Sequence, residues 1–199
     1  MQKQSLMEPK TAPERGALWD HYQEVRGDSE RLCAPLQTED YCIQTMPDVS
    51  PAKWHLAHVS WFFENFLLRP LLPGYRPFHP QFGYLFNSYY ETVGSFWPRP
   101  QRGLLSRPTV AEVYRYRAHV DGHMAALIDG ARPGDREICR QRTTLGLHHE
   151  QQHQELLLTD LKSVFALNPL RPAYHEGVTR PPCAATQAGW WDYAGSGVT

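Results

Sequence analysis

The stretch Leu147–Leu158 reads LHHEQQHQELLL and predicts a helix with two histidines on one face. His149 and His153 are four residues apart, and at 3.6 residues per turn this spacing leaves their side chains about 40° apart around the helix axis. Both imidazoles can therefore reach one metal ion. Two histidines do not complete a metal site, so the spacing predicts a further ligand elsewhere in the chain.

The face that carries the two histidines is mostly apolar. Steps of three and four residues along the helix lead to Leu145, Leu156, Leu157, Asp160 and Val164. Such a stripe is typical of a helix face that packs against a core. We therefore expect His149 and His153 to be buried, and a shared metal would satisfy imidazoles that are costly to bury alone.

His58 is the candidate third ligand. It lies in KWHLAHVSWFFE, residues 53–64, where the same steps lead to other aromatic or imidazole side chains: Trp54, His55, Trp61 and Phe62. Three histidines from two helices leave open positions on a metal, which is typical of a reactive centre. We further expect His55 and Asp160 to lie just behind the ligands, because bound imidazoles commonly donate their other N–H to a carboxylate or carbonyl.

Two alternatives compete with this interpretation. His149-Glu150-Gln151-Gln152-His153 matches the H-E-x-x-H pattern of zinc metalloproteases, although Leu156 and Thr159 stand where its extended form has Gly and His. Glu155 lies about 120° from His149 around a helix, so we expect it to face outward. The histidines could also be structural, each bonded to a backbone carbonyl in the core.

Composition narrows the class of protein. The chain has 199 residues, 20 Lys plus Arg against 21 Asp plus Glu, and a net charge of -1, so nothing indicates nucleic-acid binding. No segment has the length and apolarity of a membrane span, and the first residues lack the apolar core of a signal peptide. We expect a cytoplasmic protein without a membrane partner. The four cysteines show no paired spacing and are expected to be reduced thiols.

Periodicity predicts an all-α fold. Amphipathic helices are expected at about 13–32, 50–68, 109–128 and 135–166. Ser50 and Pro51 are expected to begin the second helix and Pro70 to stop it, while Thr109 and Glu112 have the form of a capping box for the third. Four long helices without alternating strands predict a four-helix bundle.

Two segments interrupt the helical pattern. Residues 69–107, between the second and third helices, are rich in Pro, Gly and aromatics and are expected to form a long ordered loop that contributes to a pocket. Beyond Pro169 the chain is Pro-rich, and Trp190-Trp191 followed by Gly indicates a first strand of another unit. We therefore expect a metal-binding bundle at residues 10–168, and a linker with the first strand of a second domain at 169–199.

Several motifs together resemble one enzyme family. KWHLAHVSWFFE (53–64), LFNSYYE (85–91), RGLLSRPT (102–109) and HEQQHQEL (149–156) are similar, in order and spacing, to the N-terminal half of the ergothioneine-biosynthesis sulfoxide synthases, which include a selenoneine branch. The resemblance covers about residues 10–170. It implies a DinB-like four-helix domain, followed by a domain resembling formylglycine-generating enzyme.

The resemblance implies a chemistry and a set of residues. The family binds non-haem iron(II) through three histidines, here His58, His149 and His153, and uses O2 to attach sulfur or selenium to the imidazole of trimethylhistidine (hercynine). Gln152 would help to hold hercynine near the iron. The donor is a thiol or a selenosugar, and a catalytic tyrosine is expected from the C-terminal domain.

The donor-binding loop departs from the family pattern. Many relatives read Arg-His-Pro-Arg-Pro, whose two arginines hold donor carboxylates, and here Phe96-Trp97-Pro98-Arg99-Pro100 keeps only Arg99. Trp97 offers a flat apolar face of the kind on which sugars stack, and this favours a selenosugar as the donor. The alternative is that Phe96 and Trp97 only pack the loop. The alternatives for the whole protein are a zinc-dependent hydrolase or thiol transferase on a similar bundle, and a non-catalytic bundle. The sequence indicates no oligomeric state.

Overall fold

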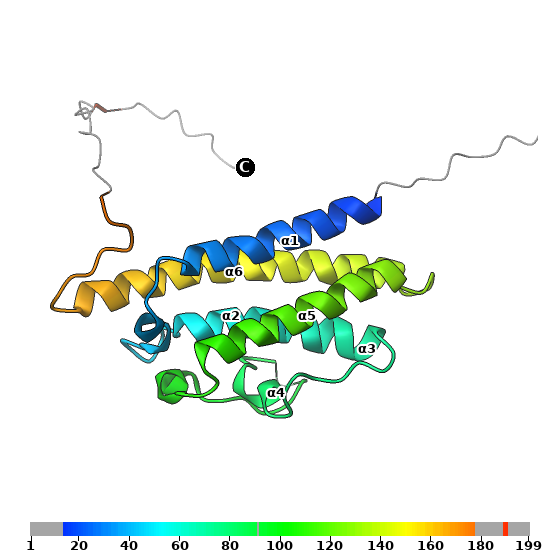
Figure 1. Ribbon diagram of the computed structural model, residues 1–199, viewed down its shortest axis with the longest axis horizontal. Helices are drawn as coiled ribbons and strands as arrows, with labels where there is room; N and C mark the ends of the chain where they lie inside the picture. Colours follow the sequence, from blue (N-terminus) through cyan, green and yellow to red (C-terminus); the bar gives the residue numbers. More distant parts are fainter. Residues whose placement is uncertain (1–13, 91, 178–188, 191–199) are drawn as a thin grey trace, which may run out of the picture.

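The computed structural model describes residues 14–90, 92–177 and 189–190, and every regular element in these residues is helical (Figure 1). The long helices are α1 (Glu14–Cys33), α2 (Ala52–Phe63), α5 (Val110–Gly130) and α6 (Arg136–Leu167). The shorter ones are η1 (Thr38–Cys42), η2 (Glu64–Leu68), α3 (Arg69–Leu71), α4 (Phe82–Leu85) and η3 (Arg99–Leu104). The predicted all-α bundle is confirmed, and the four long helices lie where periodicity placed them.

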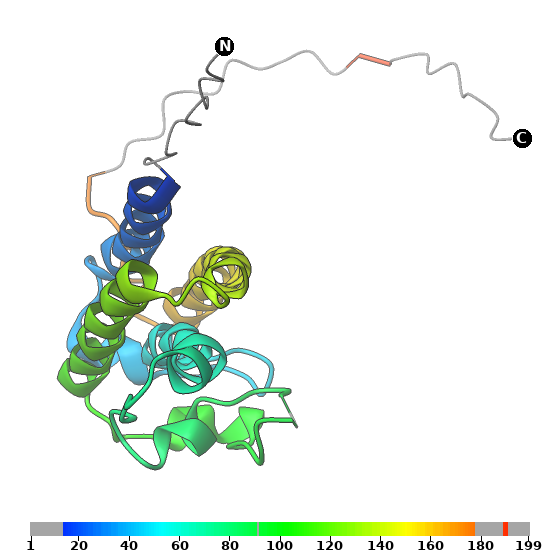
Figure 2. The same cartoon turned by 90° about the vertical axis from the view of Figure 1, so that its right-hand side faces the viewer.

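The long helices pack as a four-membered bundle, seen nearly end-on in Figure 2. Helix α2 packs against both α5 and α6, and α1 packs mainly against α6. The core between them is built from large side chains with almost no exposed surface, among them Tyr22, Trp54, Trp61, Phe63, Tyr116, Met124 and Leu127. Every residue of α2 is buried, because this helix is covered on all sides.

A glycine sets the spacing between α6 and α2. A β-carbon at Gly146 would lie 2.5 Å from the ring of Phe63 and 3.0 Å from that of Phe62, so any other residue would push the helices apart. Gly146 lies one turn before His149 on the same helix. The close approach therefore brings the histidine-bearing face of α6 against α2.

The expected boundaries of α2 need correction at both ends. Pro51, not Ser50, is the residue before the first turn, and Ser50 instead donates its backbone N–H to Asp160, 2.8 Å away, and accepts from Arg102 through its hydroxyl. At the other end the helix continues as the π-helical η2 and then as α3, with Pro70 inside α3. A proline is tolerated there because it stands in the first turn of the new helix, where an N–H is not needed.

The capping box predicted for α5 is confirmed. The Thr109 hydroxyl accepts from the Glu112 backbone N–H, and the Glu112 carboxylate accepts from the Thr109 N–H at 2.8 Å. These bonds satisfy two donors that the first turn would otherwise leave unpaired. They fix the point at which the chain leaves the segment of residues 72–109.

The segment of residues 72–109 contains α4 and η3 and lies beside α2 and α5 (Figure 2). Asn87, fully buried, donates its amide to the carbonyl oxygens of Tyr90 and Gly94 at 3.2 and 2.9 Å. The Trp54 and Trp61 indoles of α2 donate to Leu85 and Gly83 oxygens at 3.2 and 3.0 Å. Side-chain hydrogen bonds thus satisfy backbone oxygens of this irregular segment, and they hold the segment against α2.

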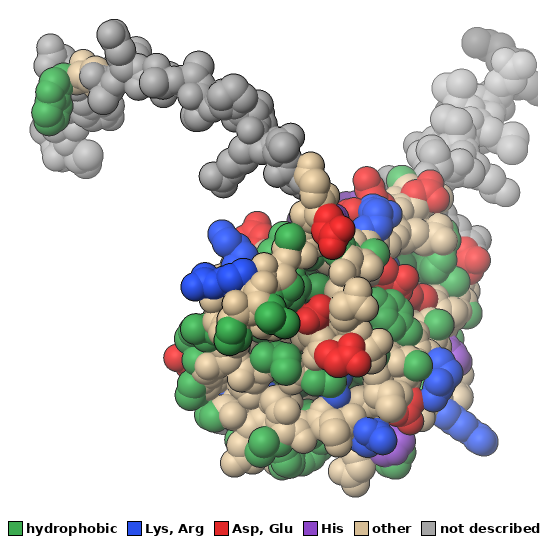
Figure 3. Space-filling model, turned by 60° about the vertical axis from the view of Figure 1, so that its left-hand side comes forward, with side chains coloured by type: hydrophobic (Ala, Val, Ile, Leu, Met, Phe, Trp, Pro, Cys, Tyr) green, Lys and Arg blue, Asp and Glu red, His purple; other side chains and the backbone are tan. Residues whose placement is uncertain are grey.

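The remaining expectations concern the surface and the tail. Cys33, Cys42 and Cys139 are free thiols, as expected, whereas Cys183 lies outside the described residues. The predicted strand at Trp190-Trp191 falls largely outside them as well. No helix of the described part of the chain is long and apolar enough to span a membrane. On the face shown in Figure 3, acidic, basic and hydrophobic side chains are interspersed.

Candidate metal centre

Three histidines from two helices converge at one point beside the bundle core. His58 of α2 and His149 and His153 of α6 each offer a ring nitrogen, and these nitrogens all lie within 4.8 Å of one another. His58 is 1% exposed, and the other two are partly buried. The chain therefore has a possible three-histidine metal site, made of the residues that the sequence singled out.

His58 is held so that one nitrogen faces the centre. Its Nδ1 donates to the Phe86 carbonyl oxygen, 2.6 Å away. The unprotonated nitrogen, which carries the free lone pair, is therefore Nε2. This Nε2 lies 3.2 Å from Nε2 of His149. The ring is stacked between the indoles of Trp54 and Trp61, with centroids 4.5 and 5.4 Å away. Two aromatic walls and one hydrogen bond thus fix both tautomer and direction.

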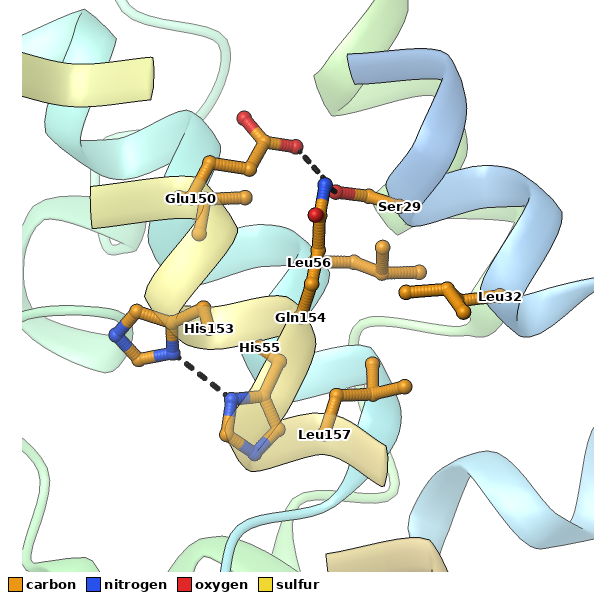
Figure 4. A pocket seen from close by; sticks show the side chains of 9 residues that line it. Ser29, Leu32, His55, Leu56, Glu150, His153, Gln154 and Leu157 are labelled. Carbon is orange, nitrogen blue, oxygen red and sulfur yellow. Dashed lines mark hydrogen bonds between the residues drawn. The ribbon is translucent and has the colours of Figure 1, made fainter. Parts of the chain in front are cut away.

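His153 is held by the two residues predicted to stand behind the ligands. Asp160 Oδ2 lies 3.0 Å from His55 Nε2. His55 Nδ1 lies 2.9 Å from His153 Nδ1 (Figure 4). With the carboxylate accepting from His55 Nε2–H, His55 Nδ1 accepts from His153 Nδ1–H. The lone pair of His153 is then on Nε2, the nitrogen that does not face His55.

His149 lacks such an anchor. Its Nδ1 is buried and has no hydrogen-bond partner, and its ring packs on Phe62 at 4.9 Å between centroids. The three histidines are therefore not equivalent. The rings of His58 and His153 are oriented by hydrogen bonds on the side away from the centre, whereas His149 has on that side only ring packing.

Burial keeps all three imidazoles neutral at pH 7. Desolvation lowers the pKa of His149 to about 4, and it lowers the pKa of His58 and His153 well below the ordinary value of 6.5. The positive charge of a neighbouring imidazole lowers the pKa of His58 and His153 further. Neutral imidazole is the form that binds a metal, so the residues present fit a divalent transition metal.

The structure argues against the metalloprotease alternative. Glu150, the acid of the H-E-x-x-H pattern, has no exposed surface and points toward Ser29 of α1 (Figure 4). It forms ion pairs with Arg26 and Arg117 at 3.0 and 3.2 Å and accepts from Ser29 at 2.6 Å. A carboxylate paired with two arginines in the core cannot serve as a general base at the centre. Glu155 is exposed, as expected.

A cavity of about 470 Å³ opens onto the histidines. Its polar lining includes Arg99, Arg102, Ser88 and Gln152, together with the three histidines, His55 and Asp160. Arg99 donates to the Tyr89 hydroxyl at 2.6 Å and to the Asp48 carbonyl oxygen. The structure thus brings Arg99 and Gln152 to the same space as the candidate ligands.

Phe96 and Trp97 are not among the residues that line this cavity. Trp97 donates its indole N–H to the Gln101 oxygen at 3.0 Å and packs edge-on against Tyr84. Phe96 is 37% exposed. The contacts of Trp97 lie within the loop, which matches for this residue the alternative in which it only packs the loop.

Arg102 is the residue that sequence reasoning missed. It is 3% exposed, its guanidinium stacks 3.3 Å from the Trp54 ring centroid, and it donates to Ser50 and Ser88. Burial, together with the positive charge of Arg99, lowers the pKa of Arg102 to about 9. Its place in the segment RGLLSRPT, directly after the loop of residues 96–100, was the available signal.

The face of α6 is less buried than its apolar stripe predicted. Leu145 and Leu156 are 59% and 39% exposed. A second cavity, of about 460 Å³, lies along this face between Leu145 and the rings of Phe62, Phe66 and Tyr90. These leucines are exposed because α6 turns only part of its apolar stripe toward α2, and the rest of the stripe lies along cavity walls.

The family of the chain follows from a match over most of the bundle. The family model of the DinB superfamily matches residues 21–157. The chain belongs to the DinB superfamily. The matched range begins in α1, ends within α6 and includes all three histidines of the candidate centre. No curated protein matches this DinB-superfamily chain at a significant level.

Proposed function

We propose that this protein is an iron(II)- and O2-dependent enzyme that forms a carbon–sulfur or carbon–selenium bond on the imidazole of hercynine. The observation that carries the proposal is the convergence of His58, His149 and His153 on a cavity that also holds Gln152 and two arginines. Three neutral imidazoles leave positions for substrate and O2, which a closed structural site does not. A bundle with structural histidines alone gives no reason for such a cavity.

The residues of the chain have separate roles in this proposal. His58, His149 and His153 would hold iron(II), which when bound supplies a site where O2 and the donor meet. Gln152 would orient hercynine at the cavity wall through its amide. The carbon–sulfur or carbon–selenium bond replaces one hydrogen on the imidazole carbon and one on the thiol or selenol. O2 is the oxidant: one of its oxygen atoms leaves with both hydrogens as water, and the other is added to the sulfur or selenium. Positioning both partners in one cavity accounts for much of the rate in such a reaction.

The cavity bears on the identity of the donor. Arg99 and Arg102 line it, whereas Trp97 does not. Two guanidiniums suit a donor with a carboxylate, because charge-assisted bonds to arginine are about twice as strong as neutral ones. The structure therefore supports an anionic thiol donor over the neutral selenosugar that the loop sequence favoured.

The domain arrangement remains part of the proposal. We propose that residues 10–168 form the metal-binding domain, and that residues 169–199 lead into a second domain that supplies the catalytic tyrosine and the rest of the hercynine pocket. Leu145 and Leu156 are exposed and each lines one of the two cavities, and they mark the surface that such a domain would cover.

The test measures O2 uptake by the full-length protein, loaded anaerobically with iron(II). We expect uptake that requires hercynine and a donor together, with a hercynine–sulfur or hercynine–selenium product detected by mass spectrometry. γ-Glutamylcysteine, cysteine and a selenosugar are compared as donors, and γ-glutamylcysteine is expected to turn over fastest.

A second candidate uses the same ligands. Three neutral imidazoles also suit zinc, and a zinc-bound water could hydrolyse a thioester or assist thiol transfer. Hydrolysis supported by zinc, with no O2 uptake in the iron form, would replace the first candidate by this one.

A further inference from the structure

A cluster of buried charges joins the helices of the bundle next to the candidate ligands. Glu150 of α6 has no exposed surface and forms ion pairs with Arg26 of α1 and Arg117 of α5, at 3.0 and 3.2 Å. The Ser29 hydroxyl of α1 donates to the same carboxylate at 2.6 Å (Figure 4). None of these four residues is more than 5% exposed, so the cluster is part of the core.

Both arginines of the cluster also hold α2. Arg26 donates to the Ser60 hydroxyl at 2.9 Å, and Arg117 donates to the Leu56 carbonyl oxygen at 3.3 Å. In the chain, these two acceptors stand two residues after and two residues before His58. Each arginine therefore bridges α2, on either side of its candidate ligand, to the carboxylate on α6.

On α6 the contacts of the cluster directly follow the candidate ligands. Glu150 is next in the chain to His149, and Gln154 is next to His153. The Gln154 amide donates to the Ser29 hydroxyl at 3.0 Å, and Figure 4 shows Glu150 and Gln154 both reaching toward Ser29. The cluster therefore holds α6 at the two residues adjacent to its histidines.

Stability alone does not account for charges at this place. Removing charges from water costs free energy that their pairing often no more than offsets, so apolar residues of similar volume frequently stabilise a core as well. Ionic hydrogen bonds differ from apolar packing because they fix register: a slip of one residue moves a helix by about 1.5 Å along its axis and breaks them. A metal site needs such precision, since its ligands must be held to within about 0.5 Å.

His149 is the candidate ligand that depends most on this register. Its Nδ1 has no hydrogen-bond partner, whereas the rings of His58 and His153 are oriented by hydrogen bonds. The His149 ring is placed only by its packing on Phe62 and by the backbone of α6. Glu150 anchors that backbone one residue away.

We propose that Glu150 is a positioning residue for the candidate metal centre. Held by the two arginines, it fixes the register of α6 against α2, so that His149 and His153 meet His58. The glutamate of the H-E-x-x-H pattern thus acts on metal binding without touching the metal. The proposal rests on the metal-binding part of the proposed function and is independent of the reaction.

The test compares Glu150→Gln with Asp121→Asn in the full-length protein. Asp121 of α5 pairs with Arg26 at 2.8 Å and accepts from the Tyr22 hydroxyl at 2.6 Å, so it belongs to the same cluster. Both substitutions exchange a carboxylate for an amide of nearly the same shape, and both are expected to destabilise the fold. Asp121→Asn is the matched control, because α5 contributes no residue to the candidate metal centre.

Metal binding is measured with cobalt(II), under conditions where urea unfolding shows each variant to be folded. Lower stability then leaves the affinity unchanged, because almost all molecules are competent to bind. We expect Glu150→Gln to lower cobalt affinity about 10-fold, at the lower end of the effect of groups that orient metal ligands, and to change the visible absorption of the bound ion. Asp121→Asn should change neither.

Ser60→Ala separates position from charge, and it also serves if Glu150→Gln does not fold. The substitution removes the hydroxyl through which Arg26 holds α2, and it changes no charge. We expect a loss of cobalt affinity smaller than that of Glu150→Gln. The two losses should be non-additive in the double variant, because both act through Arg26.

Three outcomes would overturn the positioning role. The first is a cobalt affinity that both Glu150→Gln and Ser60→Ala leave unchanged. The second is an equal loss in Asp121→Asn and Glu150→Gln, and the third is a loss in Glu150→Gln that Ser60→Ala does not share, which would assign the effect to charge. Failure of the unmodified protein to bind cobalt would instead contradict the proposed metal site itself.

Discussion

Helices α5 and α6 each carry two histidines at the same four-residue spacing, and only one of the two pairs meets a third. His149 and His153 on α6 converge with His58 from α2. His119 and His123 on α5 have ring centroids 4.3 Å apart and lie against the Tyr75 ring. Spacing alone therefore brings two imidazoles together, and packing against a second helix decides whether they become part of a metal site.

The hydrogen bonds of the two pairs differ as well. On α5, His123 Nδ1 donates to the His119 carbonyl oxygen at 2.7 Å, and His119 Nε2 lies 3.3 Å from the Arg76 oxygen. Both rings are oriented by backbone groups, as expected of structural histidines. On α6, His153 is instead backed by a histidine and a carboxylate. A carboxylate behind an imidazole raises its strength as a ligand, and the α5 pair has none.

The largest expected effect comes from removing the third histidine. His58→Ala should lower zinc or iron(II) affinity about 100- to 1,000-fold. The binding free energy of a structural zinc ion, shared among its ligands, is about 3 kcal/mol or more for each ligand. His123→Ala on α5 should leave affinity unchanged. Competition with a chromogenic chelator measures both. Equal losses in the two variants would show that the α6 centre is not distinct from the α5 pair.

The backing residues should matter less than a ligand. Asp160→Ala frees the His55 ring and, through it, His153, and should lower metal affinity about 10- to 100-fold. Asp160→Asn keeps an acceptor oxygen and should recover part of the loss, which a merely structural role would not require. Glu155→Ala, exposed on the same helix, is the matched control. Unchanged metal affinity in Asp160→Ala, with the fold intact, would contradict the role given to this pair.

The comparison can also be tested by adding a third histidine to the α5 pair. The Tyr75 ring lies 5.7 and 5.0 Å from His119 and His123, comparable to the 4.6 to 5.0 Å between rings in the α6 centre. Tyr75→His should therefore create a second metal site, weaker than the first by about 10-fold or more because backbone oxygens, and not a carboxylate, orient the rings of His119 and His123. Cobalt titration should give two equivalents for the variant and one for the unmodified protein. A single equivalent in both would show that a third ring is not sufficient.

Acid should affect the metal-free protein modestly through the same centre. The pKa of His149 is lowered by burial to about 4, below the value of about 6.5 in an unfolded chain, so the unfolded state binds more protons between these values. The contribution is fully present above pH 6.5 and is lost as pH falls toward 4, by about 1–3 kcal/mol. Urea unfolding at pH 7 and pH 5 measures it, and His149→Gln should reduce the dependence by the share of His149, because the lowered pKa values of His58 and His153 keep theirs. A slope that this substitution leaves unaltered would assign the acid sensitivity to other groups.

The sequence predicted those parts of the molecule in which residues repeat with the period of an α-helix. Helix positions came from the 3.6-residue pattern, and the histidines of α6 were recognisable because four residues bring side chains to one face. His55 and Asp160 were identified in the same way, from their place one or two turns from a ligand, and the structure pairs them. Whether these residues bind a metal is a prediction that chemistry must test.

The rest depended on contacts that no local pattern encodes. The segment of residues 72–109 is held by single side chains such as Asn87, so its course over α2, and with it the position of Arg102, could not be read from periodicity. The π-helical turn after Phe63 and the place of Pro70 inside α3 reflect tertiary packing around buried Glu64, which binds Tyr75 and Tyr116. The exposure of Leu145 and Leu156 likewise depends on how α6 is rotated against its neighbours.

The central claim is that His58, His149 and His153 hold one metal ion. X-ray absorption at the iron edge, on full-length protein loaded anaerobically with one equivalent of iron(II), tests it most directly. The account predicts three imidazole nitrogens at about 2.0–2.2 Å, falling to two in His58→Gln and staying at three in His123→Gln. Fewer than three imidazoles in the unmodified protein, or a coordination shell that His58→Gln leaves intact, would contradict the claim.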